Sequence, residues 1–231
     1  MPIRAIVFDL DGTLADTEPL HFEAFAAALR PEGIALDRAD YFARLIGYND
    51  RDCFAVVLAE HGRPHGEVQL AELIDRKAAI YGATIARREV LYPGAAEFVR
   101  RCAERFPLVL VTGTLRAEAE AILDGGGLRP LFLEIIAAED VTRGKPDPEG
   151  FLAALGRLGF RLRPRPSIVA AECLAIEDTA AGIAAARAAG MRVLALRHTA
   201  GADALAGADL TRPSIAATDL DEVLRHFAAA R

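Results

Sequence analysis

Two carboxylates stand close together near the start of the chain, at Asp9 and Asp11. They follow an apolar run that ends at Phe8, and its β-branched residues indicate a buried strand. Paired carboxylates at the end of such a strand are costly unless a cation lies between them. Mg²⁺ is the expected cation, because it takes hard oxygen ligands and usually keeps waters and phosphate oxygens in its shell. A metal would also leave one carboxylate free to act as a nucleophile.

A simpler alternative is a strand that ends in an Asp-Gly turn with a second aspartate by chance. Three later features weigh against it. Residues 108–114 are another apolar strand that ends in hydroxyls, Lys145 lies in a proline-rich turn, and a third apolar strand ends in Glu177-Asp178. Strand ends on one edge of a parallel sheet converge on one crevice. The combined residues would accept a phosphoryl group and a divalent cation.

Four stretches of the chain resemble, in order, the four motifs of the haloacid dehalogenase superfamily: residues 9–13, Thr112, Lys145 and residues 177–178. Their spacing is similar to that of the phosphatase branch that includes β-phosphoglucomutase, CbbY-type sugar phosphatases and phosphoglycolate phosphatases. The resemblance covers nearly the whole chain. It implies a Rossmann-like α/β core with an inserted all-helical cap.

The two aspartates are expected to divide the chemistry between them. Asp9 would attack phosphorus and form an aspartyl-phosphate, which splits one difficult displacement into two. Asp11 would protonate the leaving group as a general acid and then activate water as a general base. The resemblance implies in addition that the backbone carbonyl of Asp11, rather than its carboxylate, contacts the metal.

The other strand ends supply the remaining predicted site residues. Thr112 would hydrogen-bond a phosphoryl oxygen beside Gly113, although an ordinary strand threonine is the alternative. Lys145 would neutralise the phosphoryl oxygens and the nucleophile, and the alternative is a solvated lysine in a turn. Asp178 should complete the metal site with Glu177 as a ligand or outer partner. Both acids could also cap the helix that follows them.

The order of expected elements predicts an α/β fold with a doubly wound parallel sheet. Strands and helices alternate after residue 93, whereas only helical segments follow the first strand, with Asp37 and Asp50 as expected N-caps. An inserted helical domain accounts for this interruption. We therefore expect a catalytic core at residues 1–15 and 89–231, and a helical cap at residues 16–88.

The cap is expected to provide substrate contacts. Thr17 and His21 share one face of the first helix, and a histidine beside Phe22 alone would be structural more often than catalytic. The resemblance matches His21 and Lys77 to cap positions of β-phosphoglucomutase and places Gly47 in a loop that contacts substrate. Glu18 resembles the phosphatase members instead.

One cap position departs from the mutase pattern. The arginine that the mutase family carries in the cap loop matches Asp50 here. Arg51 stands one residue later and could bind substrate only if the loop is re-registered. Thr13, where the mutase type usually has an apolar residue, also disfavours mutase activity.

Composition excludes several classes of partner. The 231 residues carry a net charge of −6, which argues against nucleic acid. No apolar run approaches the roughly 18 residues of a membrane span. Three widely spaced cysteines and a first strand that leaves no room for a signal peptide predict a cytoplasmic protein with free buried thiols. The expected partner is a small phosphorylated metabolite, bound by a monomer or weak homodimer.

The sequence thus predicts a Mg²⁺-dependent phosphatase that acts on a small phosphorylated metabolite, expected to be a sugar phosphate. A β-phosphoglucomutase-type phosphomutase and a phosphoglycolate phosphatase are the alternatives. A 2-haloacid dehalogenase is disfavoured, because those relatives lack the second motif aspartate that Asp11 provides. A receiver-like signalling module is disfavoured by the helical insertion.

Overall fold

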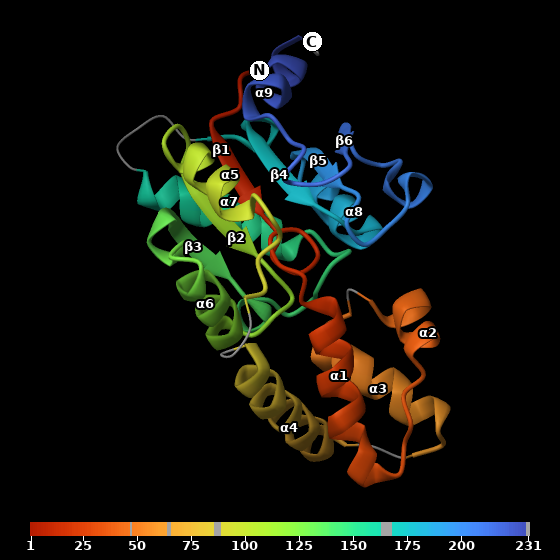
Figure 1. Cartoon of the computed structure of the whole chain (residues 1–231). Coiled ribbons are helices and arrows are strands. Elements are labelled where there is room, and N and C mark those ends of the chain that lie inside the picture. The colour runs from red at the N-terminus through yellow and green to blue at the C-terminus, as the bar shows by residue number, and fades with distance from the viewer. Residues whose placement is uncertain (47, 64–65, 86–88, 163–167, 230–231) are drawn as a thin grey trace. The chain divides into compact units, whose positions relative to one another are not determined.

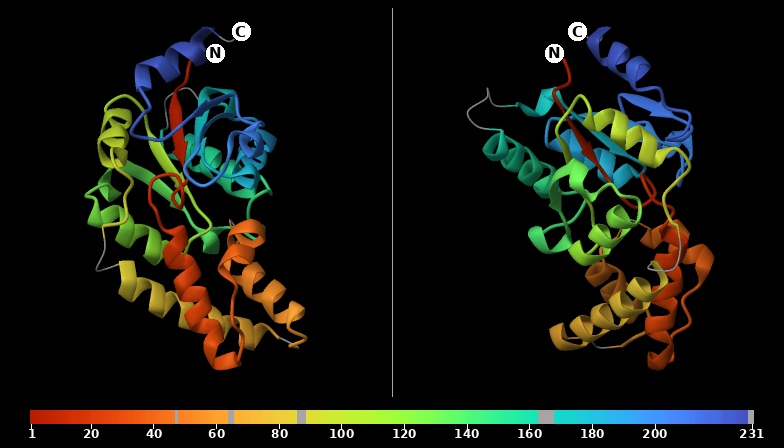
Figure 2. Two further views of the ribbon diagram at one scale, coloured as in Figure 1. Left: turned by 45° about the vertical axis from the view of Figure 1, so that its right-hand side comes forward. Right: turned by 60° about the vertical axis from the view of Figure 1, so that its left-hand side comes forward.

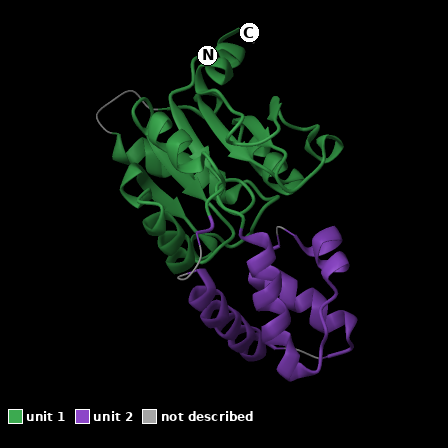
Figure 3. Cartoon of the chain, viewed as in Figure 1, with its two compact units in different colours: residues 1–16, 91–231 green, residues 17–90 purple. Residues whose placement is uncertain are grey.

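A computed structural model describes residues 1–46, 48–63, 66–85, 89–162 and 168–229. The chain divides into two compact units (Figure 3), one of Met1–Asp16 with Leu91–Arg231 and the other of Thr17–Val90. The predicted boundaries lie within two residues of these divisions. They stay a prediction as domain boundaries, because compactness alone does not show that a unit folds independently.

The first unit is built on a six-stranded sheet in the order β3-β2-β1-β4-β5-β6, and every strand pair in it is parallel. This confirms the predicted doubly wound sheet (Figure 1). The strands are β1 Ala5–Phe8, β2 Leu108–Val111, β3 Phe132–Ile136, β4 Cys173–Glu177, β5 Arg192–Leu196 and β6 Leu210–Arg212.

Side chains of β1 alternate between the two faces of the sheet, as strand geometry requires. Ala5 and Val7 belong to an apolar cluster that also contains Phe151 of α7 (Glu149–Arg161) and Ile183 of α8 (Ala180–Ala188). Phe8 points to the other face, where its ring meets Phe98 of α5 (Ala95–Ala103) edge-on, with ring centroids 6.3 Å apart. Helices therefore cover both faces, which explains why β1 is apolar throughout.

The helices of the first unit follow the strands in alternation. They are α5 Ala95–Ala103, α6 Arg116–Gly125, α7 Glu149–Arg161, α8 Ala180–Ala188 and α9 Leu220–Ala229. All three ribbon views place α9 beside the segment that leads into β1 (Figure 2). There Arg192 of β5 donates to the carbonyl of Phe227 at 3.0 Å.

The second unit is helical in its described residues. It comprises α1 Glu18–Leu29, the short α2 Arg38–Asp40 continued by a π-helical turn at Tyr41–Leu45, α3 Asp50–Glu60 and α4 Glu67–Ile85. Asp37 caps α2, as predicted, and accepts from the amide of Asp40 at 2.8 Å. The predicted cap at Asp50 is wrong, because Asn49 accepts from the amide of Asp52 and caps α3 instead.

The core of the second unit is made of apolar and aromatic side chains from α1, α3 and α4 together with the π-helical turn. Its largest buried members include Phe25, Leu29, Phe54 and Leu58. The three cysteines of the chain are buried and unoxidised, as predicted. Within the described residues, no helix has both the length and the apolar character that a membrane crossing requires.

Candidate functional site

The ends of β1 and β4 bring the predicted acids together. These strands are neighbours in the sheet, with Phe8 in register with Ile176, so Asp9 and Glu177-Asp178 leave the sheet side by side. The chain order reverses between these two strands, and ligands of open α/β sheets bind at such a switch point. The amide of Asp9 donates to the carbonyl of Ile176 at 3.0 Å and fixes this placement.

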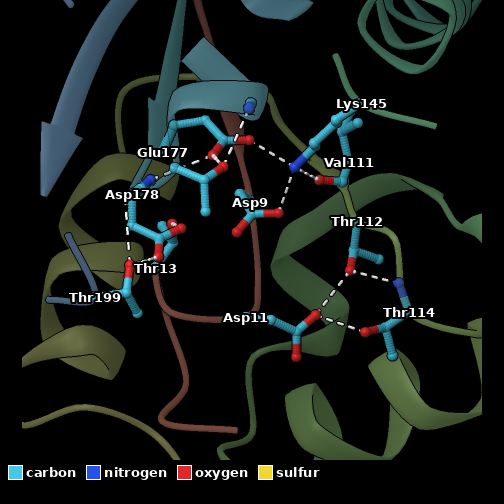
Figure 4. A network of polar contacts seen from close by, with 12 residues as sticks. Asp9, Asp11, Thr13, Val111, Thr112, Thr114, Lys145, Glu177, Asp178 and Thr199 are labelled. Carbon is cyan, nitrogen blue, oxygen red and sulfur yellow. Dashed lines mark hydrogen bonds and ion pairs between the residues drawn. The ribbon is translucent and has the colours of Figure 1, made fainter. Parts of the chain in front are cut away.

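Lys145 reaches the same point from the turn before α7. Its Nζ lies 2.5 Å from Oδ1 of Asp9 and 2.5 Å from Oε1 of Glu177, and it donates to the carbonyl of Val111 at 3.2 Å. Figure 4 shows the ammonium between the two carboxylates. One lysine therefore connects three strand ends, those of β1, β2 and β4.

Burial of the site raises the pKa of the Asp9 carboxyl well above its ordinary value, although the Lys145 ammonium acts against this rise. The neighbouring carboxylates Glu177, Asp178 and Asp11 add to it. For Lys145, burial favours a lower pKa, but Asp9 and Glu177 together outweigh burial and raise its pKa. One ammonium is thus too little positive charge for this cluster, and a further cation would favour the ionised nucleophile.

Asp11 points away from that cluster toward the end of β2 (Figure 4). Its Oδ2 accepts hydrogen bonds from the hydroxyl of Thr112 at 3.1 Å and from that of Thr114 at 2.5 Å. The amide of Thr114 in turn donates to the Thr112 hydroxyl at 3.0 Å. The two aspartates therefore occupy different surroundings, which suits two different chemical roles. The predicted Gly113 lies in the same turn, between the two threonines.

Asp178 is held by hydroxyl groups from two other loops. Thr13 donates to its Oδ1 at 3.1 Å, and Thr199 donates to its Oδ2. Gly12 packs so closely that a Cβ there would lie 2.1 Å from Oδ2 of Asp178. The carboxylate is therefore fixed in orientation before any ligand binds.

The first turn of α8 accommodates Glu177. The alternative of a cap by Asp178 is wrong, because the Thr179 hydroxyl caps α8 by accepting from the amide of Gly182 at 3.1 Å. A Cβ at Gly182 would lie 2.0 Å from the carboxyl carbon of Glu177. Only glycine therefore leaves room for this carboxylate over the helix N-terminus, whose dipole favours negative charge.

Three acids of the site meet the requirements of a metal centre. One carboxylate oxygen each from Asp9, Glu177 and Asp178 lies within 4.8 Å of the others, and all three residues are buried. Such a set of hard oxygen ligands suits a divalent cation. The carboxylate of Asp11 is not in this group, which is compatible with the backbone role that the resemblance implied for it.

Predicted residues of the second unit make contacts of their own. Lys77 is buried, with its Nζ 3.0 Å from Oδ2 of Asp50. His21 is stacked on Tyr81, with ring centroids 4.2 Å apart. The structure leaves the predicted substrate contacts of these residues untested.

The remaining predicted residues of this unit differ in burial. Glu18 is buried and accepts a long hydrogen bond of 3.4 Å from the hydroxyl of Tyr41. Arg51 is exposed and pairs with Glu67. Gly47 lies outside the described residues.

Sequence reasoning did not assign four residues that the structure brings to the site. Thr13 and Thr114 stand within the recognised motifs, so their position in the chain could have indicated them. His198 and Thr199 follow β5 in a stretch with no motif, and only the fold places them beside Gly12 and Asp178.

Known proteins resemble this chain along most of its length. Residues 3–190 match the family model of the haloacid dehalogenase-like hydrolases. Protein CbbY of Rhodobacter capsulatus is 34% identical over 94% of this chain and 96% of its own length. Fructose-1-phosphate phosphatase YqaB of Escherichia coli is 32% identical over 83% of this chain and 95% of its own.

A solved structure of a relative has a fold similar to that of this chain. The crystal structure of a CbbY mutant from Rhodobacter sphaeroides in complex with xylulose-(1,5)bisphosphate matches with a TM-score of 0.81 and 29% identity. The match covers 93% of this chain and 95% of that one. With the four motif stretches gathered at one sheet edge, this chain belongs to the haloacid dehalogenase-like hydrolases, in the branch that contains the CbbY proteins.

Proposed function

We propose that this chain is a Mg²⁺-dependent phosphatase that hydrolyses a small phosphorylated sugar through an aspartyl-phosphate on Asp9. The observation that carries the proposal is the ammonium of Lys145 at 2.5 Å from both Asp9 and Glu177, with Asp178 beside them. A nucleophile, a fixed cation and a ligand set for a second cation converge there. This arrangement of charges would bind an anionic phosphoryl group more favourably than it would bind a neutral ligand.

In the first chemical step, a carboxylate oxygen of Asp9 attacks phosphorus and the bond from phosphorus to the sugar oxygen breaks. Asp11 donates its proton to the leaving oxygen, so the sugar departs as a neutral alcohol. Lys145 lies against Asp9 and stabilises the negative charge that builds on the phosphoryl oxygens.

In the second step, Asp11 takes a proton from water and the resulting hydroxide attacks the phosphorus of the aspartyl-phosphate. The acyl-phosphate bond breaks, inorganic phosphate leaves and Asp9 regains its carboxylate. Because Thr112 and Thr114 both donate to Asp11, its carboxylate is oriented before either proton transfer.

We propose Mg²⁺ as the divalent cation, held by Asp9, Asp178 and Glu177 with the carbonyl of Asp11. When bound, it would supply positive charge to the phosphoryl oxygens and favour ionised Asp9. Burial raises the pKa of Asp9, so its carboxyl group needs this additional positive charge to be ionised.

Similarity to named phosphatases supports a sugar phosphate as substrate. One such relative is a fructose-1-phosphate phosphatase, and the CbbY crystal structure contains a sugar bisphosphate. We propose Glu18, His21, Gly47, Arg51 and Lys77 as the substrate contacts of the cap, with Gly113 beside the phosphoryl group. The mutase alternative has less support, since Asp50 pairs with Lys77 and adds no positive charge of its own.

The test is phosphate release from a panel of small phosphorylated compounds, with Mg²⁺ and with EDTA. The panel includes sugar monophosphates, sugar bisphosphates, 2-phosphoglycolate and β-glucose 1-phosphate. We expect Mg²⁺-dependent release from a sugar phosphate and a loss of at least about 10⁴-fold in Asp9→Asn. Conversion of β-glucose 1-phosphate to the 6-phosphate with a bisphosphate primer, without phosphate release, would establish the mutase instead.

A further inference from the structure

The loop after β5 contacts the site from a further strand end. Thr199 donates its hydroxyl to Oδ2 of Asp178 and, at 3.3 Å, to the backbone carbonyl of Asp178 (Figure 4). Its neighbour His198 approaches a different loop, and Nδ1 of its ring lies 2.9 Å from the carbonyl oxygen of Gly12. Two consecutive residues thus hold the segment after β1 and the segment after β4.

The hydrogen bonds of His198 define its tautomer. The backbone N–H of Ile215 donates to Nε2 at 3.1 Å, so Nε2 carries no proton in the neutral ring. The proton therefore lies on Nδ1 and is donated to the Gly12 carbonyl. Burial lowers the pKa of His198, although Gly12 and Asp16 act against this, and the neutral ring is accordingly the form present near pH 7. The ring of Tyr92 lies against that of His198, tilted by 35°, with centroids 4.0 Å apart.

Gly12 stands at the closest approach of the catalytic segment to Asp178. Its backbone φ is +76°, a conformation that residues other than glycine rarely adopt. The N–H of Gly12 donates to the carbonyl of Ala15 at 2.8 Å, and the carbonyl of Gly12 accepts from His198. Hydrogen bonds therefore hold the peptide groups on both sides of Gly12. Because Gly12 connects Asp11 to Thr13, the orientation of this peptide determines where both side chains point.

We propose that His198 is a positioning residue of this enzyme. Its Nδ1–H holds the Gly12 carbonyl and thereby keeps Asp11 aimed at the leaving group and Thr13 aimed at Asp178. His198 contacts none of the reacting atoms, and it acts through the backbone of the catalytic segment. The inference rests on the proposed phosphatase function and extends it to a strand end outside the four motifs.

Two amide variants separate the two hydrogen bonds of the ring. The side-chain amide of Asn lies near the position of Nδ1, so His198→Asn keeps a donor for the Gly12 carbonyl. The longer Gln places its amide near Nε2, so His198→Gln keeps a partner for Ile215 and loses the contact to Gly12. His226, exposed on α9, provides the matched control His226→Gln.

We expect kcat of His198→Gln to fall about 10–100-fold with little change in KM, the size of effect seen when a partner outside the reacting shell is removed. His198→Asn should recover most of that loss, and His226→Gln should match the wild type. Amide hydrogen exchange, followed by mass spectrometry, should accelerate in the peptide that contains Gly12 and Thr13 in the Gln variant alone.

A Gln variant with wild-type kcat and wild-type exchange in that peptide would overturn the proposal. Equal losses of kcat in the Asn and Gln variants, accompanied by equal falls in melting temperature, would also overturn it and assign His198 to general packing. If the wild type released no phosphate from any compound, the proposed function would fail. Hydrogen exchange would still decide whether His198 holds Gly12.

Discussion

Each compact unit buries one lysine against a carboxylate, and the two lysines have different surroundings. Lys145 contacts both Asp9 and Glu177, so negative charge exceeds positive charge around it. Lys77 lies 3.0 Å from Asp50, and its Nζ also lies 4.6 Å from the ring centroid of Tyr81. The first arrangement belongs to a set of three buried carboxylates that suits a further cation, whereas the lysine of the second also faces an aromatic ring.

This difference separates a site built for binding from a pair built into a helical core. A cluster with surplus carboxylates is unfavourable on its own and gains stability from a cationic ligand. A buried ion pair within a helical core instead affects folding, because removal of one partner leaves a buried charge unpaired and lowers the free energy of unfolding. We therefore expect the loss of Lys145 to act mainly on activity, and the loss of Lys77 to lower stability in addition to any effect on substrate binding.

Among the substitutions that test the contrast between the two lysines, the largest effect is expected for Lys145→Met. Removal of the ammonium leaves phosphoryl oxygens without their fixed cation, so kcat for phosphate release should fall about 10²–10³-fold. Circular dichroism should report an unchanged helix content, which serves as the folding control. A variant that retained near wild-type turnover would place the phosphoryl-stabilising cation elsewhere.

Asp178→Asn tests the surplus of carboxylates directly. The amide removes one of the three negative groups. The Mg²⁺ concentration for half-maximal activity should therefore rise by about 10²-fold or more, which is beyond the effect of losing a residue that only orients a metal ligand. Isothermal titration with Mg²⁺ gives a second readout independent of turnover. An unchanged Mg²⁺ affinity in both experiments would remove Asp178 from the metal site.

Lys77→Met should act on stability. Its side chain is 1% exposed and that of Asp50 is 15% exposed, so the variant leaves a carboxylate with little access to water. We expect a loss of about 2–4 kcal/mol in the free energy of unfolding, somewhat below the cost of breaking a fully buried pair. Urea denaturation measures it, and Lys77→Met combined with Asp50→Leu should recover part of the loss.

Activity of the same variant tests whether Lys77 also contacts substrate. Equal fractional changes on a sugar phosphate and on an aryl phosphate would limit Lys77 to the helical core. A selective loss on the sugar phosphate would support the predicted contact. If stability did not change at all, the contrast between the two lysines would be wrong.

The smallest effect on stability is expected for Arg51→Ala. Arg51 pairs with Glu67 at the surface, where water and salt screen the interaction. The midpoint of urea denaturation should stay within error of the wild type, with Glu67→Ala as the matched partner variant. A loss of kcat/KM on sugar phosphates at unchanged stability would support the proposed contact of Arg51 with substrate, and unchanged activity would contradict it.

The sequence predicted those elements whose apolar pattern is unmistakable. β2 begins at the predicted Leu108 and ends at Val111, before the hydroxyl residues that the prediction included, because only its first four residues form a buried apolar run. β6 was missed, since its three residues include the exposed Thr211 and form no apolar run. β3 starts at Phe132, but the exposed Leu133 and the partly exposed Glu134 interrupt its apolar pattern, so the sequence indicates only the end of this strand.

The same reasoning explains which site residues were found. Asp9, Lys145 and Asp178 are brought together by strand order, which the alternation of elements already indicates. The hydroxyls of Thr114 and Thr199 reach their partners through local loop geometry, which no spacing in the sequence encodes. Cap identities fail for a similar reason, since Asn49 and Asp50 are both capable caps and only the backbone selects between them.

The central claim, a phosphoryl group carried by Asp9, is tested most directly in the Asp11→Asn variant with an aryl phosphate. The aryl leaving group needs no general acid, so Asp9 can still be phosphorylated, whereas hydrolysis lacks its base. We predict a burst of one aryl alcohol per active site, followed by slow turnover, and a phosphoryl group on the peptide that contains Asp9. No burst, or a phosphoryl group on another peptide, would contradict the account.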